Sequence, residues 1–303
     1  MKDYLTEIND RFPIRKSDKE KTAFYDYVVG ELGEERVRKE TLEKQHNNIV
    51  IGDPAEAKVI FTAHYDTPAT SLVPNVMFPA NKVLGMLFHM LYPLAMAIFS
   101  LLVAFGIGAA FSLKDSDVMC IYLVLYFAIF IGSTRLVTNP HNKNDNTSGV
   151  ATVLSIAKDM QSDKVAFVLF DNEEKGLLGS KAFVKKHIKS LNNKMVVNFD
   201  CVGNGDQIIF IAKEKAEGLL EYELLKASFV DNDRFAVHHI PFKKSLGNSD
   251  HKSFPCGVGV VASKKGRAVK FITGRIHTPR DTVADSENIY YLAKNAISFA
   301  EKL

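Results

Sequence analysis

Acidic and imidazole side chains follow three short apolar segments of the sequence, at the point where each segment ends. The three junctions read KVIFTA-His64-Tyr65-Asp66, VAFVLF-Asp171-Asn172-Glu173-Glu174 and MVVNF-Asp200. Imidazole nitrogens and carboxylate oxygens are ligands that zinc binds in proteins, and manganese and cobalt accept similar donors as substitutes. The sequence therefore predicts metal-dependent chemistry where these segments meet.

The spacing within two of these junctions suggests which side chains bind a metal and which assist them. Asp66 lies two residues after His64 and can accept the ring N–H that a metal does not use, which would fix the orientation of the imidazole. Glu173 and Glu174 are adjacent, so their side chains point in different directions. One of the two can bind a metal while the other stays free to accept a proton.

Two further candidate ligands lie in polar segments. Asp145 directly precedes a segment with a Thr/Ser helix cap, and His277 lies in the loop GRIHTPRDT. A carboxylate such as Asp145 can bridge two cations ~3.5–4 Å apart, which is the separation used by hydrolytic two-metal sites. Two imidazoles and three carboxylates are thus available for metal binding.

Apolar segments alternate with segments of helical periodicity along most of the chain. The segments that suit buried strands are 58–63, 165–170, 195–199, 207–212 and 258–262. Helices are expected from Asp18, near Thr147, Gly176 and Lys215, and after Ser286. This alternation predicts an α/β domain in which helices cover both faces of a mostly parallel sheet. Because ligands gather at the carboxyl ends of such strands, the candidate residues should converge on one edge of the sheet.

Residues 83–134 form a strongly apolar insert. The stretch 83–112 carries no formal charge, and 118–133 follows after the polar sequence LKDSD. An α-helix needs ~20 residues to cross a bilayer core, so the first stretch exceeds that length and the second lies near its lower limit. We expect a two-helix membrane hairpin, because a soluble helix of this length normally has a polar face. A buried hairpin or an oligomer interface in a soluble protein is the alternative.

The charges around the insert predict its orientation. Lys82, Arg135 and Lys143 flank it, whereas the LKDSD turn holds one Lys and two Asp. Basic residues concentrate on the cytoplasmic side of membrane proteins. We therefore expect a membrane protein whose catalytic domain faces the cytoplasm. His89, inside the insert, is expected at a contact between helices.

Composition excludes several other classes of protein. Of 303 residues, 47% are hydrophobic and 24% are charged, and the net charge is +3. This length is sufficient for one large domain with a substantial core. No run of Lys and Arg of the kind that binds a phosphate backbone is present, so nucleic acid is not an expected partner. Three scattered cysteines without a CxxC pair indicate free thiols rather than a disulfide framework.

Six motifs occur in the order that is typical of co-catalytic zinc aminopeptidases. They read AHYDTPA, NDNTSGVA, LFDNEEKGLLGS, NFDCVG, NSDHKSF and IHTPRDT. From about Lys58 to the C-terminus, apart from the insert, the chain resembles the superfamily of aminopeptidase S and aminopeptidase Y. Glutaminyl cyclase and the transferrin receptor are outlying relatives. The resemblance implies one three-layer α/β/α zinc-exopeptidase domain over residues 1–303, with residues 83–134 inserted, acting on peptides with a free N-terminus.

The resemblance also implies a role for each candidate residue. Two zinc ions are expected, with His64 and Asp200 at one and Glu174 and His277 at the other. Asp145 would bridge the two ions. Glu173 would be the general base for hydrolysis, and Asp66 would orient His64.

Two departures from the family pattern leave alternatives open. The insert places Asp145 81 positions after His64, where relatives have a short connection. Several relatives have a Tyr that stabilises the oxyanion where this chain has Ile276, which leaves His251 or the metals for that task. A glutaminyl cyclase with one zinc and a non-enzymatic membrane receptor or scaffold are the alternative functions. The complete ligand set favours the aminopeptidase.

Overall fold

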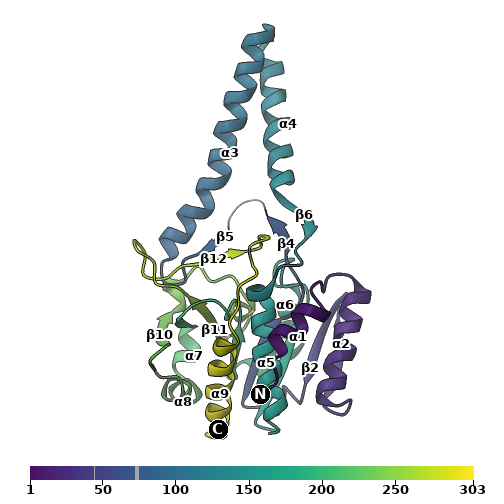
Figure 1. Ribbon diagram of the computed structural model, residues 1–303, viewed down its shortest axis with the longest axis vertical. Helices are drawn as coiled ribbons and strands as arrows, with labels where there is room; N and C mark the ends of the chain where they lie inside the picture. Colours follow the sequence, from purple (N-terminus) through teal and green to yellow (C-terminus); the bar gives the residue numbers. More distant parts are fainter. Residues whose placement is uncertain (44, 72–74) are drawn as a thin grey trace.

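The computed structural model consists of an α/β body and a pair of long helices that projects from one end of it (Figure 1). It describes residues 1–43, 45–71 and 75–303, and only the backbone of residues 134–136. Both termini lie at the end of the body opposite to the projecting helices. The predicted α/β domain with an apolar helical hairpin is confirmed.

An eight-stranded sheet forms the centre of the body, in the order β1-β2-β7-β3-β8-β11-β9-β10. The strands are Val37–Leu42 (β1), His46–Ile51 (β2), Val59–His64 (β3), Val165–Phe170 (β7), Met195–Phe199 (β8), Gln207–Ala212 (β9), Ala236–Pro241 (β10) and Cys256–Ser263 (β11). Four central strands are parallel to one another, in the order β7-β3-β8-β11. Strand β10 is parallel to β9. The β1–β2, β2–β7 and β11–β9 pairings are antiparallel. The sheet is therefore mostly parallel at its centre, as predicted.

Helices cover both faces of this sheet. They are Tyr4–Arg11 (α1), Asp18–Leu32 (α2), Ser148–Asp159 (α5), Leu178–Leu191 (α6), Glu214–Glu217 (α7), Leu220–Ser228 (α8) and Ser286–Glu301 (α9). The core is divided by the sheet because successive strand residues point to opposite faces. Val59 and Phe61 of β3 pack with α1, α2, α5, α8 and α9, whereas Ile60 packs with α6. The result is the expected three-layer α/β/α arrangement.

Local sequence explains where several elements begin. Helix α2 begins at Asp18 because Ser17 and Glu20 form a capping box, in which each side chain accepts a hydrogen bond from the other's backbone N–H. Strands β7, β8 and β9 match the predicted apolar segments. Strands β1, β2 and β10 were not predicted. In β1 only part of the strand is buried, and β2 buries His46 and Asn48, so neither has the apolar pattern of a central strand.

The projecting hairpin consists of α3 (Lys82–Phe111) and α4 (Asp115–Ser133). By length and composition alone, both helices could cross a membrane, and only 22% and 6% of their most apolar stretches are buried. The helices approach closely near the tip, where a Cβ on Gly108 would lie 2.4 Å from Val118 Cγ2. The two predicted helices are therefore present.

Two small strand pairs form the base of the hairpin. Strand β4 (Ala69–Ser71) pairs antiparallel with β6 (Thr134–Thr138), and β5 (Asn75–Met77) pairs antiparallel with β12 (Thr273–Ile276). The chain therefore leaves the body after β3 and returns to it at the same place. Strand β12 leads directly into His277, so the base of the hairpin adjoins the candidate site.

Candidate active site

Three neighbouring strands deliver candidate ligands to one edge of the sheet. His64 is the last residue of β3, Asp200 follows β8, and Glu173 and Glu174 follow β7 by a short turn. These three strands lie side by side and run parallel, in the order β7-β3-β8. The convergence expected from the sequence is therefore observed.

Loops bring the two remaining candidates to the same edge. Asp145 lies in the turn Lys143–Thr147, which precedes α5 and has a non-helical backbone at Asp145, and His277 directly follows β12. The backbone N–H groups of Asn144 and Asp145 donate to the two carboxylate oxygens of Asp281, at 3.1 and 2.9 Å. Asp281 therefore fixes the Asp145 turn, a role that the sequence analysis missed.

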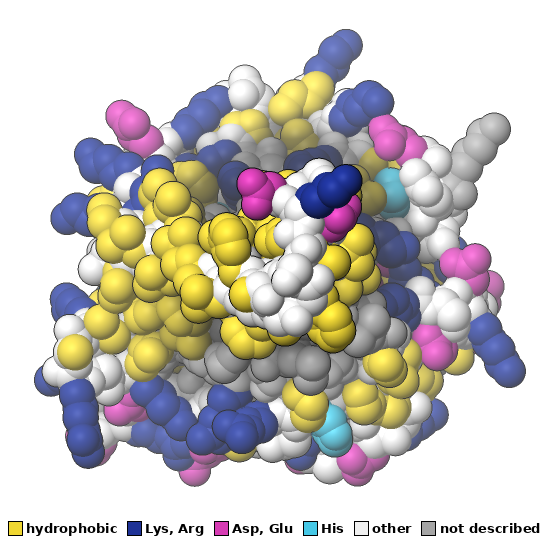
Figure 2. Space-filling view, turned by 90° about the horizontal axis from the view of Figure 1, so that it is seen from above, with side chains coloured by type: hydrophobic (Ala, Val, Ile, Leu, Met, Phe, Trp, Pro, Cys, Tyr) yellow, Lys and Arg dark blue, Asp and Glu magenta, His cyan; other side chains and the backbone are white. Residues whose placement is uncertain are grey.

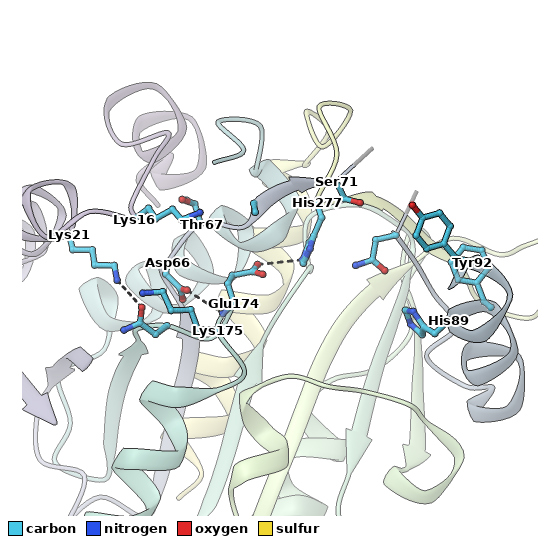
Figure 3. Close-up of a pocket in the computed structure, with 14 residues that line it drawn as sticks. Lys16, Lys21, Asp66, Thr67, Ser71, His89, Tyr92, Glu174, Lys175 and His277 are labelled. Atoms are coloured by element: carbon cyan, nitrogen blue, oxygen red, sulfur yellow. Dashed lines mark hydrogen bonds and ion pairs between the residues drawn. The ribbon is translucent and has the colours of Figure 1, made fainter. Parts of the chain in front are cut away.

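Asp145 lies between the two imidazoles. One of its carboxylate oxygens is 3.3 Å from Nε2 of His64, and the other is 2.9 Å from Nε2 of His277. A second carboxylate faces each imidazole, with Asp200 Oδ1 3.7 Å from His64 Nε2 and Glu174 Oε1 3.4 Å from His277 Nε2. In Figure 3 the side chains of Glu174 and His277 point toward one another, and a dashed line joins them. The five residues thus form two imidazole–carboxylate groups that share Asp145.

The donors of these groups fit metal ions. In each group, one ligand atom from each residue lies within 4.8 Å of the others: His64, Asp145 and Asp200 in the first, and Asp145, Glu174 and His277 in the second. Glu174 Oε1 and Asp200 Oδ1 are buried, and neither accepts a hydrogen bond within the described residues. Buried carboxylate oxygens are normally paired, so these two atoms are free for a cation. Nitrogen and oxygen donors in this combination suit zinc.

The electrostatics of the two imidazole–carboxylate groups also favour binding of a positive ion. Burial opposes protonation of His277, but the Glu174 and Asp145 carboxylates outweigh it and raise the pKa of His277 to about 10. Burial, with the Asp145 charge adding to it, raises the pKa of Glu174 to about 8. Burial also acts against ionisation of Asp145, yet the neighbouring His277 and His64 hold the pKa of that carboxyl below its usual value. A divalent cation would neutralise this field.

Asp66 contacts both the His64 imidazole and the turn that carries Glu173 and Glu174. Its carboxylate accepts hydrogen bonds from the backbone N–H groups of Glu173 and Glu174, at 3.0 and 3.2 Å. Its Oδ1 lies 3.6 Å from Nδ1 of His64, and that same ring nitrogen lies 3.2 Å from the Asp66 carbonyl oxygen. Asp66 therefore positions the turn that holds the two Glu residues as well as the imidazole.

Two buried basic residues of the N-terminal segment contact the segments that carry the site residues. Arg15 is fully buried, and its Nε donates to the carbonyl of Tyr65 at 2.6 Å while its guanidinium also donates to Asn142 and Thr147. It therefore joins the His64 segment to the Asp145 turn. Lys21 of α2 forms a buried ion pair with Asp171, 2.6 Å apart. Neither residue had a signal in the sequence, because each acts on partners far along the chain.

A cleft of about 570 Å³ opens beside these residues. His64, Asp145, Glu173, Asp200 and His277 line it, together with apolar side chains such as Met77 and Leu246. The start of α3 contributes Gly85 and His89 to the wall. Figure 3 shows the adjoining pocket, which shares Glu174, His277 and His89 with this cleft and has His89 and Tyr92 of α3 on the side opposite Glu174. The expectation that His89 lies at a contact between helices was therefore wrong; His89 is exposed and faces the cleft.

The residues around Ile276 concern the absence of the Tyr that several relatives have at this position. Ile276 is buried and lines the cleft, so it presents no polar atom there. His251 lines the same cleft, and neither of its ring nitrogens has a hydrogen-bond partner within the described residues. Burial lowers the pKa of His251 to about 4, so the imidazole is neutral and one of its nitrogens carries a hydrogen.

Comparison with known proteins places the chain in a family. Residues 138–299, more than half of the chain, match Peptidase family M28. The chain belongs to this peptidase family, in agreement with the superfamily that its motifs resemble. No curated protein matches it in sequence.

Solved structures of low sequence identity share the fold. Glutaminyl cyclase from Porphyromonas gingivalis matches with a TM-score of 0.59 and 15% identity, covering 99% of this chain and 97% of that one. A Zn-dependent exopeptidase from Parabacteroides distasonis gives 0.57 and 15%, covering 98% and 95%. The LapA aminopeptidase of Legionella pneumophila gives 0.54 and 16%, covering 98% and 69%. At these identities the likeness concerns the fold alone.

Proposed function

We propose that this member of peptidase family M28 is a membrane-anchored aminopeptidase with two zinc ions. The observation that carries the proposal is the position of Asp145 between His64 and His277, one oxygen toward each ring. A carboxylate placed in this way can bridge the two cations of a two-metal hydrolytic site. The remaining carboxylates, Asp200 and Glu174, would complete the two sites.

The chemistry divides between the metal and the protein. When bound, zinc would polarise the scissile carbonyl and lower the pKa of a water molecule. Glu173 faces the cleft beside His64 and Glu174, and the hydrogen bond from its backbone N–H to Asp66 fixes its position. We assign to Glu173 the transfer of a proton from the attacking water to the leaving amine. Burial raises the pKa of Glu173 well above its usual value, which makes this carboxyl able to hold that proton.

His251 is the proposed donor to the oxyanion. Its imidazole is neutral, has an unpartnered N–H, and lines the cleft in which the carbonyl would lie. A donor already oriented toward the developing charge lowers the barrier to acyl transfer. This residue would replace the Tyr that several relatives place at position 276.

We further propose that residues 83–134 anchor one zinc-exopeptidase domain, formed by the rest of residues 1–303, to a membrane. Both helices are long enough to span a bilayer core, and large apolar side chains are exposed along them. The basic flanks of the insert support a cytoplasmic body. A membrane-impermeant maleimide should therefore label Ser116→Cys, at the hairpin tip, in intact cells. It should label Lys294→Cys, at an exposed position on the body, only after permeabilisation; the reverse pattern would overturn the orientation. Both variants carry Cys120→Ser.

Hydrolysis at a free N-terminus is the activity to test. Full-length protein in detergent micelles should release nitroaniline from an aminoacyl-anilide, lose this activity with a chelator and regain it with zinc. The matched N-acetylated anilide should not react, because a blocked N-terminus is not a substrate of an aminopeptidase. Equal turnover of both compounds would indicate another hydrolase.

The glutaminyl cyclase reaction is the second candidate, since a cyclase shares the fold over nearly its full length. A peptide with an N-terminal Gln separates the two reactions. The aminopeptidase releases free glutamine, whereas a cyclase leaves pyroglutamate on an uncut peptide. A non-enzymatic receptor or scaffold gives neither product.

A further inference from the structure

The loop between β11 and β12 carries an unusual concentration of positive charge. From His251 to Arg280 the sequence has no Asp or Glu. Seven cationic side chains in this stretch are exposed, and six of them follow β11: Lys264, Lys265, Arg267, Lys270, Arg275 and Arg280. We call these six residues the basic loop cluster. A cluster of this sign without interspersed acids attracts anions.

The cluster is not used to stabilise the fold through ion pairs. Within the described residues, none of its six members lies within ion-pair distance of a carboxylate. The loop itself is closed by two backbone hydrogen bonds of 2.9 Å between Lys264 and Ile272. Its conformation is therefore set by the backbone, and the charged side chains remain available to a partner.

The cluster lies at the base of the apolar hairpin. Strand β12, which follows the loop, pairs with β5, and β5 leads into α3. Seen from above, the apolar side chains of the hairpin occupy the centre of this face, and many Lys and Arg side chains, with some Asp and Glu among them, lie around its rim (Figure 2). The basic loop cluster and the apolar hairpin thus lie on the same end of the body.

The first turns of α3 continue the apolar surface down to this base. One face of the helix exposes large apolar side chains at helical spacing: Val83, Met86, Leu87, Met90, Leu91 and Leu94. The opposite face is seated on the body, where a Cβ on Gly85 would lie 3.1 Å from Leu246. An exposed apolar stripe beside a cationic cluster is the pattern of surfaces that bind anionic bilayers.

We propose that the basic loop cluster binds the anionic phospholipid headgroups of the leaflet into which the hairpin inserts. The proposal rests on the membrane insertion proposed above, and it adds a lipid ligand to the body of the protein. The apolar stripe of α3 would enter the acyl region while the cluster contacts phosphates at the surface. A cytoplasmic leaflet is the more anionic one, so the sign of the cluster agrees with the proposed orientation.

The bound leaflet would hold the catalytic cleft at the membrane surface. Arg275 and Arg280 flank His277 in sequence, and the carbonyl of His277 accepts a hydrogen bond of 2.6 Å from the backbone N–H of Ser71, at the base of the hairpin. The wall of the cleft includes His89 of α3. Lipid contact and catalysis therefore share one segment, and peptides adsorbed on the bilayer would reach the cleft directly.

The test uses full-length protein in nanodiscs of phosphatidylcholine, with or without phosphatidylglycerol. An environment-sensitive dye on Ala268→Cys, in a Cys120→Ser background, reports on the loop. We expect emission at shorter wavelength in the anionic discs than in the neutral ones, and loss of this difference at high salt. Equal emission in both discs would overturn the proposal, as would failure of the protein to enter the discs.

Charge-reversal variants identify the residues responsible. Lys264→Glu/Lys265→Glu/Arg267→Glu should abolish the difference between the discs. The matched control is Lys164→Glu/Lys294→Glu/Lys302→Glu, just before β7, within α9 and just after α9, and it should retain the difference. Equal effects of the two triple variants would overturn the assignment. A shift caused by inorganic phosphate in neutral discs would mean that the cluster binds free anions instead.

Hydrolysis of a soluble aminoacyl-anilide is measured in the same discs. Turnover without a lipid-dependent shift would leave the proposed peptidase standing and remove the lipid site. A lipid-dependent shift without turnover would leave the lipid site standing and remove the proposed peptidase. The two proposals can therefore fail separately.

Discussion

Asp281 holds Asp145 in place: its carboxylate accepts the backbone N–H of Asp145 at 2.9 Å, and that of Asn144 at 3.1 Å. Asp281 is itself buried and lies on the loop that follows His277. One carboxylate therefore joins the segment of Asp145 to the segment of His277. Groups that orient ligands in this way contribute to metal affinity without touching the metal.

The Asp281→Asn substitution should weaken zinc binding by about 10- to 100-fold. The amide keeps one acceptor oxygen but turns an N–H group toward a backbone N–H, which disturbs the Asp145 turn. Competition with a chromogenic chelator measures the affinity. Asp206→Asn, at an exposed position, is the control and should bind zinc as the unmodified chain does. Unchanged affinity in Asp281→Asn would show that the turn is fixed by other contacts.

The Glu173→Gln substitution should retain zinc and lower kcat by about 10²- to 10⁴-fold, because the amide cannot carry a proton from water to the amine. The neighbouring Glu174→Gln variant is the comparison: it should lose zinc as well as activity. Steady-state hydrolysis together with the zinc content separates the two cases. Near-normal turnover by Glu173→Gln would exclude this residue as the base.

The Lys21→Met substitution should lower the free energy of unfolding by ~3–5 kcal/mol, because it leaves the Asp171 carboxylate buried without its partner. Lys21 is 6% exposed and Asp171 is fully buried. The Lys185–Glu43 pair is exposed, so Lys185→Met should cost less than ~1 kcal/mol. Denaturant unfolding in the same detergent compares the two variants. Equal losses would contradict a special role for the buried pair.

His239 should make the fold sensitive to mild acid. Burial, with the charge of Lys226 adding to it, lowers the pKa of His239 to about 4 in the folded protein. The unfolded chain takes up a proton near pH 6.5, so stability is lost as the pH falls from about 6.5 through 4. In His239→Gln this part of the loss should disappear.

The control for this prediction is Phe299→Leu, because Phe299 is buried against Phe61 rather than against His239 and has no titratable group. It should lower Tm by a similar amount at pH 7 and pH 4. The difference in Tm between the unmodified chain and His239→Gln should shrink across the same range. A constant difference would mean that His239 does not account for the acid sensitivity.

Local sequence was sufficient to find the strands that carry the candidate ligands. The strand that ends at His64 and the one that ends before Asp200 are buried along their whole lengths, so their apolar composition is continuous and the polar residue after each is conspicuous. The start of α2 was also predictable, because the Ser17 cap acts within four residues. These features depend on neighbours in sequence.

The features that were missed depend on distant partners. Arg15 contacts residues more than 100 positions away, and the role of Asp281 depends on a turn 136 positions before it. His89 follows an apolar pattern that gives no sign of a cleft, and only the packing of α3 on the body places it there. Long-range contacts of this kind leave no trace in periodicity or composition.

The number of zinc ions per chain tests the central claim most directly. The purified full-length protein, after equilibration with zinc and removal of the free ion, should contain two ions per chain by elemental analysis. His64→Ala and His277→Ala should each reduce this number, since each removes one imidazole from a different group. A value of one or none in the unmodified chain would contradict a site built on two metals that share Asp145.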